Sequence, residues 1–214
     1  MQIIKNQFHT DPVNSKVERY FVVYKPYNMV SQFISSHSVN LLGDLDYKFP
    51  EGIHAIGRLD NLSEGLLILT TNKKLTRLLF QGTTLHRRTY LVQVDKTVTN
   101  EELQKLRSGI LFQIRGGNYY TSIPCEVNIV DSPEGIFKAG YELPKQLSYT
   151  WLTVTLTEGK FHQVRKMVAG IKHRVFRLIR ISIEDIVLGD LRPGEVRETE
   201  EKFLFEKLKI NYKH

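Results

Sequence analysis

The segment from residue 57 to residue 69, Gly-Arg-Leu-Asp-Asn-Leu-Ser-Glu-Gly-Leu-Leu-Ile-Leu, places an acid and a base in a short loop before an apolar run. The apolar run predicts a buried strand, and a buried strand is a rigid support for the loop that precedes it. Asp60 is therefore a candidate catalytic carboxylate. A structural ion pair between Asp60 and Arg58 on the surface is the alternative that this segment alone leaves open.

Two further segments carry polar groups beside predicted strands. Residues 87–94, Arg-Arg-Thr-Tyr-Leu-Val-Gln-Val, predict a strand with two cations at its beginning and Tyr90 close behind them. Residues 156–167 predict the end of a strand, a glycine turn and the first turns of a basic helix. A tyrosine in a strand is most often a core or edge aromatic, so neither segment identifies a site by itself.

Positive charge is concentrated in one part of this chain, whose net charge is +7. Between residues 160 and 180 there are seven lysines and arginines and no aspartate or glutamate. A solvated face is the usual meaning of such a run. Here apolar residues alternate with the cations, so a helix and a strand must pack on a core and still present one sign of charge. This pattern favours binding to a phosphate backbone.

The order of the predicted elements indicates an α+β domain. We expect strands at residues 20–24, 66–70, 89–94, 122–130, 151–157, 175–183 and 186–188, and helices at 41–45, 73–80, 99–109 and 161–172. Thr99 and Glu102 form a capping box at the beginning of the third helix. Residues 131–149 are expected to form a long loop. Strict alternation of strand and helix is absent, so an antiparallel or mixed sheet is expected.

Several classes of site have no support in the sequence. Cys125 is the only cysteine, which excludes an intrachain disulfide and a cysteine-ligated zinc, and its apolar surroundings predict a buried side chain. No His-Glu-x-x-His motif, phosphate loop or dinucleotide fingerprint occurs, so we expect no metal and no cofactor. No apolar run could cross a bilayer, and the first residues lack a secretory signal. We therefore expect a cytoplasmic protein without a membrane partner.

Five motifs in a characteristic order give this chain a family resemblance over residues 20–198. They are Lys25-Pro26, residues 57–67 around Asp60, Arg88-Thr89-Tyr90, residues 158–167 and residues 178–195. In this order the chain resembles the pseudouridine synthases, in the branch typified by the ribosomal small-subunit enzyme and its large-subunit relatives. Many relatives have glycine where this chain has Asn28, and asparagine also tolerates a left-handed backbone.

The resemblance implies a fold, a reaction and roles for individual residues. The fold is a mixed, mostly antiparallel sheet with flanking helices and a catalytic cleft along the sheet. Asp60 would act as the nucleophile, Tyr90 would pack against the flipped uracil, and Arg165 would form an ion pair with Asp60. The reaction converts uridine to pseudouridine and needs no cofactor. The remaining positions expected to contact RNA are Arg58, Arg87, Arg88, Lys160, His162, Lys166, Arg177 and Arg180.

The resemblance also implies a domain plan and a substrate. Residues 1–17 are expected to be an extension, residues 18–198 a catalytic domain of two sublobes, and residues 199–214 a charged helical tail docked by Phe203, Leu204 and Leu208. Many relatives carry an amino-terminal S4 RNA-binding domain, and we expect none here. Short relatives without the S4 domain modify large-subunit RNA, so we expect 23S rRNA as the substrate. We also expect a monomer. A synthase of transfer RNA and a catalytically silent ribosome-assembly factor are the alternatives.

Overall fold

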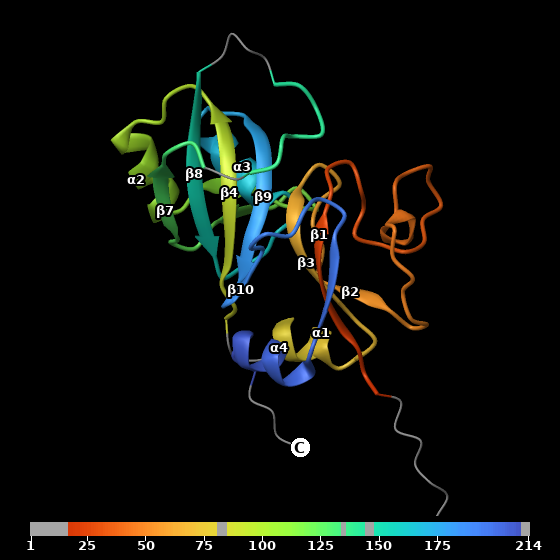
Figure 1. Ribbon diagram of the computed structural model, residues 1–214. Helices are drawn as coiled ribbons and strands as arrows, with labels where there is room; N and C mark the ends of the chain where they lie inside the picture. The colour runs from red at the N-terminus through yellow and green to blue at the C-terminus, as the bar shows by residue number, and fades with distance from the viewer. Residues whose placement is uncertain (1–16, 81–84, 134–135, 144–147, 211–214) are drawn as a thin grey trace, which may run out of the picture.

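The computed structural model describes residues 17–80, 85–133, 136–143 and 148–210 (Figure 1). The predicted extension at residues 1–17 lies outside them except for its last residue. The helices are α1 (Leu75–Phe80), α2 (Asn100–Ser108), α3 (Gln163–Gly170), α4 (Glu201–Lys207) and a 3-10 turn at Leu42–Asp44. The strands are β1 (Tyr20–Lys25), β2 (His54–Ile56), β3 (Glu64–Thr70), β4 (Arg88–Asp95), β5 (Leu111–Gln113), β6 (Tyr119–Thr121), β7 (Glu126–Val130), β8 (Tyr149–Leu156), β9 (Val175–Ile183), β10 (Ile186–Val187) and β11 (Val196–Thr199).

A mixed, mostly antiparallel sheet forms the frame of the described chain and confirms the predicted α+β class. Its main path runs β11-β1-β3-β9-β4-β8-β7, with β10 paired to β9 and β2 paired to β3. Within this sheet only β3 and β9 run parallel, and their ladder is two residue pairs long. In Figure 1 the strands form two groups, β1, β2 and β3 on one side and β4, β7, β8 and β9 on the other. The short parallel contact joins the two groups.

Gly65 allows the two groups of strands to approach each other. It lies opposite Arg180 in the β3–β9 ladder and has a φ of +101°. A Cβ atom at this position would lie 2.4 Å from the carbonyl oxygen of Arg180. Only glycine fits such a backbone contact without displacing a strand. The close approach brings the loop that precedes β3 next to β9 and β4.

Three apolar clusters hold the elements in place. One joins β4, β8 and β9 to α2 and α3, and a second covers one face of β1 and β3 with α1 and α4. The third lies on the opposite face of β1 and β3, under residues 29–55. The capping box predicted for α2 is confirmed, because the Thr99 hydroxyl accepts from the Glu102 amide and the Glu102 carboxylate accepts from the Thr99 amide. None of the described helices has the length and apolar character needed to span a membrane.

The tail differs from the prediction in one residue. Helix α4 packs below the sheet beside α1 (Figure 1), with Leu204, Phe205 and Leu208 buried. The side chain of Phe203 is 49% exposed, so its predicted docking is wrong. Phe205 takes its place because it follows Leu204 on the buried side of the helix.

The structure also contains short strands that the sequence did not predict. They are β2, β5, β6 and β11, each of three or four residues. Segments of this length carry too little alternation to be recognised, and their pairing partners determine them. Of the described residues of the predicted loop, 131–133, 136–143 and 148 contain no helix or strand, whereas Tyr149 begins β8.

Candidate active site

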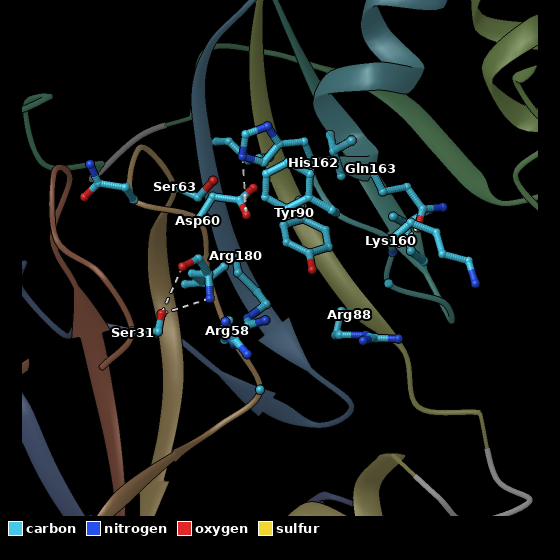
Figure 2. A pocket seen from close by; sticks show the side chains of 18 of the residues that line it. Ser31, Arg58, Asp60, Ser63, Arg88, Tyr90, Lys160, His162, Gln163 and Arg180 are labelled. Carbon is cyan, nitrogen blue, oxygen red and sulfur yellow. Dashed lines mark hydrogen bonds and ion pairs between the residues drawn. The ribbon is translucent and has the colours of Figure 1, made fainter. Parts of the chain in front are cut away.

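A cleft of about 720 Å³ lies where the loop before β3 faces β4, β8 and the beginning of α3. It brings together residues that are separated by more than 100 positions in the sequence. Figure 2 shows their side chains arranged around the opening. Seven of the predicted site residues line it: Arg58, Asp60, Arg88, Tyr90, Lys160, His162 and Arg180.

The backbone of the loop before β3 is fixed by Ser31, a residue that the sequence did not indicate. The Leu59 amide donates to the Ser31 hydroxyl at 2.9 Å, and the same hydroxyl donates to the Leu59 carbonyl at 3.0 Å. The Ser63 amide then donates to the Asp60 carbonyl at 3.0 Å and closes a turn. The side chain of Asp60 remains 30% exposed. The Asp60 carboxylate is thus presented to the cleft on a rigid backbone.

The imidazole of His162 is the side chain that pairs with the carboxylate of Asp60. Its Nε2 atom lies 3.7 Å from Oδ1 of Asp60, and Figure 2 marks this pair. His162 has a left-handed backbone, with φ of 56°, at the beginning of α3. The turn before it is held by the Lys160 amide, which donates to Oε1 of Gln163 at 2.8 Å.

The predicted ion pair between Arg165 and Asp60 is not formed. Arg165 donates through Nη2 to the Leu62 carbonyl at 2.7 Å and through Nη1 to the Val175 carbonyl at 3.5 Å. Among the described residues, the ion pair of Asp60 within 4.0 Å is the one with His162. Burial lowers the pKa of Arg165, and the carboxylate of Asp60 opposes this shift from a longer distance. Arg165 therefore supports the turn after Asp60 through a carbonyl group.

Tyr90 and Arg180 line the same cleft as Asp60. They are paired across β4 and β9, where a bulge follows Thr89. The Arg180 side chain is buried and donates from Nε to the Leu66 carbonyl at 2.8 Å. Burial lowers the pKa of Arg180, while the nearby Tyr90 hydroxyl raises it. Nη2 of Arg180 and Nε of Arg88 have no hydrogen-bond partner among the described residues. Both atoms are buried, although Arg88 and Arg180 line the cleft.

Three of the residues predicted to contact RNA lie elsewhere, and one of these predictions is wrong. Arg177 is only 4% exposed and donates to both carboxylate oxygens of Glu64, at 2.9 and 3.0 Å. It cannot reach an RNA backbone. Its acidic partner lies 113 positions earlier, outside the basic run, so the run looked unpaired in sequence. Arg87 forms an exposed ion pair with Glu126, and Lys166 lies beside the cleft.

Lys25 also supports the loop that carries Asp60. Its ammonium is buried and donates to the carbonyls of Met29 at 2.6 Å, Pro26 at 2.8 Å and Asn61 at 3.3 Å. The loop between Pro26 and Met29 uses Asn28 with a φ of 57°, which confirms that asparagine adopts the left-handed conformation here. Burial lowers the pKa of Lys25 to about 7, although Glu64 and Asp60 raise it.

Replacing Lys25 by methionine is expected to remove a pH dependence of stability. Between the folded pKa of about 7 and an unfolded pKa of about 10.4, the unfolded chain keeps a proton that the folded protein has released. Stability of the wild type therefore rises with pH in this window. We expect the wild-type advantage in unfolding free energy over Lys25→Met to grow by about 2 kcal/mol from about pH 7 to about pH 9. Urea unfolding at both pH values measures it, and an unchanged difference would contradict the lowered pKa.

Other reactive groups are poorly placed for chemistry. Cys125 is partly buried, and burial raises the pKa of its thiol to about 11, which disfavours the thiolate. No group of three or more His, Cys, Asp or Glu side chains in the described residues is arranged to hold a metal ion. The cleft around Asp60 is therefore the site that the described chain offers.

Comparison with known proteins agrees with this geometry. The family model described as RNA pseudouridylate synthase matches residues 19–170. Ribosomal large subunit pseudouridine synthase E of Vibrio parahaemolyticus is 36% identical over 90% of this chain and 77% of its own length. Ribosomal small subunit pseudouridine synthase A of Yersinia pestis is 28% identical over 89% of this chain and 74% of its own length.

A solved structure supports the same assignment at the level of the fold. A crystal structure of a pseudouridylate synthase superposes with a TM-score of 0.71 and 27% sequence identity, over 90% of this chain and 74% of that one. The match confirms the fold that the resemblance implied. Because the family model covers well over half of the sequence and the fold agrees, this chain belongs to the RNA pseudouridine synthase family and is an enzyme that acts on RNA.

Proposed function

We propose that this enzyme isomerises a specific uridine of 23S ribosomal RNA to pseudouridine, with Asp60 as the nucleophile. The observation that carries the catalytic part is the position of Asp60, which is held on a rigid turn and shares one cleft with Tyr90. The substrate part rests on similarity to a relative named for the large ribosomal subunit, at 36% identity, against 28% for the relative named for the small subunit.

The target uridine must leave its base stack to reach Asp60, which costs a few kcal/mol. The carboxylate of Asp60 then either attacks C1′ of the ribose or acts as the base that begins glycal formation. The bond between C1′ and N1 breaks, and its electron pair leaves with the uracil. The base turns and C5 bonds to C1′; this displaces the Asp60 carboxylate from C1′ in the first route, and C2′ regains its proton from Asp60 in the second. The proton on C5 is then removed while N1 gains one. Tyr90 packs against the uracil and assists the loss of the C5 proton.

Cations around the cleft would offset the cost of removing the base from its stack. Arg58, Arg88 and Lys160 line the cleft and can neutralise phosphates on either side of the target. Arg58 is exposed, so it can also occupy the place that the flipped nucleotide leaves in the stack. Arg165 contributes indirectly, because its bond to the Leu62 carbonyl steadies the turn after Asp60.

Mapping of pseudouridines in total RNA from cells with and without the gene tests this proposal. We expect at least one site in 23S rRNA to disappear, and the purified protein to restore it on the unmodified RNA. Loss of a transfer RNA site instead would favour the first alternative. Loss of no site, with RNA binding retained, would favour the silent assembly factor. The monomeric state, the cytoplasmic location and the domain boundaries at residues 17 and 198 stay predictions.

A further inference from the structure

A second groove adjoins the catalytic cleft and is not explained by the chemistry at Asp60. It has a volume of about 750 Å³ and lies between residues 111–115, which include β5, and the helix α3. Phe161 lines both this groove and the cleft. Phe161 precedes His162, the residue 3.7 Å from Asp60. A ligand in the groove would therefore lie directly beside a base bound at Asp60.

Phe161 gives the groove an exposed aromatic surface. Its side chain is 68% exposed. The ring stacks on the imidazole of His162, with centroids 3.8 Å apart and an interplanar angle of 17°. Two stacked rings at the edge of a cleft form a platform on which a further planar group can stack. A nucleic-acid base is such a group, and aromatic platforms bind bases of any sequence.

The charge of the groove matches a phosphate backbone. Lys166 of α3 places its Nζ atom 5.7 Å from the ring centroids of both Phe112 and Phe161 and donates to the Gln113 carbonyl at 2.7 Å. Arg115 adds a second cation. None of the described residues that line the groove is acidic. Aromatic rings with interleaved cations are the usual composition of a single-strand binding surface.

We propose that this groove binds the unpaired nucleotide next to the target uridine, with its base stacked on Phe161 and its phosphate near Lys166 and Arg115. The proposal rests on the proposed function only in that the substrate is RNA. It assigns no preference for a particular base, because stacking uses a face that all four bases share. The groove extends the binding surface by one nucleotide and holds the strand in register with Asp60.

Binding of short oligonucleotides tests this directly. One probe is a fluorescein-labelled RNA of nine nucleotides in which only the central one, a uridine, carries a base. In two other probes, the nucleotide directly 5′ or directly 3′ of this uridine also carries a base. For the wild type, we expect the additional base on one side to strengthen binding by about tenfold, in line with the stacking free energy of a single base. Phe161→Ala should gain nothing from that base, whereas Phe161→Trp should keep the gain.

The chain offers a matched control at the opposite end of the molecule. Phe203 on α4 is 49% exposed and has Lys207 at 5.9 Å from its ring, whereas α4 lies below the sheet and far from α3 in Figure 1. Phe203→Ala should keep the tenfold gain. Lys166→Gln should reduce the slope of log affinity against log salt by about 0.7, the value for one phosphate contact in a single strand, and Lys207→Gln should not.

The outcomes separate this inference from the proposed function. Binding does not require catalysis, so the comparison can be read even if no site in 23S rRNA depends on the gene. If the wild type gains no affinity from the second base on either side, the proposal that the groove binds the neighbouring nucleotide is wrong. The proposal is also wrong if Phe161→Ala and Phe203→Ala gain the same affinity from the additional base. In both cases the modification of rRNA by the wild type can still hold.

Discussion

Replacing Asp60 by asparagine is expected to abolish pseudouridine formation and to leave RNA binding close to that of the wild type. Asparagine has the same size and leaves the bonds between Ser31 and Leu59 and between the Ser63 amide and the residue 60 carbonyl in place, but it is neither a nucleophile nor a base. Loss of a central catalytic group lowers turnover on the order of 10⁴-fold or more. Quantification of pseudouridine in 23S rRNA incubated with each protein, together with filter binding of the same RNA, measures both effects.

An exposed carboxylate provides the control for this substitution. Asp190 has a side chain that is 83% exposed and pairs with Arg197 away from the cleft. Asp190→Asn removes the same charge and should leave modification unchanged. Modification that survives Asp60→Asn would disprove the proposed chemistry. A wild type that binds RNA and modifies none would instead support the silent assembly factor.

Breaking the ion pair between Glu64 and Arg177 is expected to cause the largest loss of stability. Both side chains are buried, and the pair joins β3 to β9 next to their short parallel ladder. Arg177→Met would leave the Glu64 carboxylate uncompensated, close to the Tyr24 hydroxyl, whose pKa burial and this carboxylate already raise. We expect a loss of about 3–5 kcal/mol in the free energy of unfolding, measured by urea titration.

Two further variants test whether burial of the pair causes this loss of stability. The exposed pair of Arg87 and Glu126 has a similar separation of 2.7 Å, and Arg87→Met should cost less than about 1 kcal/mol. The double variant Glu64→Leu with Arg177→Met should recover a large part of the loss, because it leaves no unpaired buried charge. Equal losses for Arg177→Met and Arg87→Met would show that burial does not determine the strength of the pair.

The elements that could be predicted from the sequence are those with a strong local signal. The helix α2 has its capping box within four residues, and β3 and β4 carry long runs of apolar and β-branched side chains. Their approximate bounds follow from neighbours in the chain. The four short strands lack such a signal because hydrogen bonds to distant partners define them. Strand β5, for example, exists through its pairing with β6.

The candidate catalytic residues show the same division. Asp60 and Tyr90 were predicted from motif order, and the cleft brings them together. The support around them was not predicted. Ser31 binds the Leu59 backbone across 28 positions, and Arg165 binds the Leu62 carbonyl instead of the Asp60 carboxylate. A sequence motif records which side chains occur, whereas the partner of each depends on packing between distant segments.

The sequence by itself determined the α+β class, the family and the candidate carboxylate at Asp60, because each depends on residue types in a fixed order. Only the tertiary structure decided how the positive charges are used. Arg177 is neutralised inside the protein by Glu64, while the half-buried Arg88 and the exposed Lys160 line the cleft. The seven cations of residues 160–180 look alike in sequence. Burial and partners more than 100 positions away separate the structural cations from those that remain available to RNA.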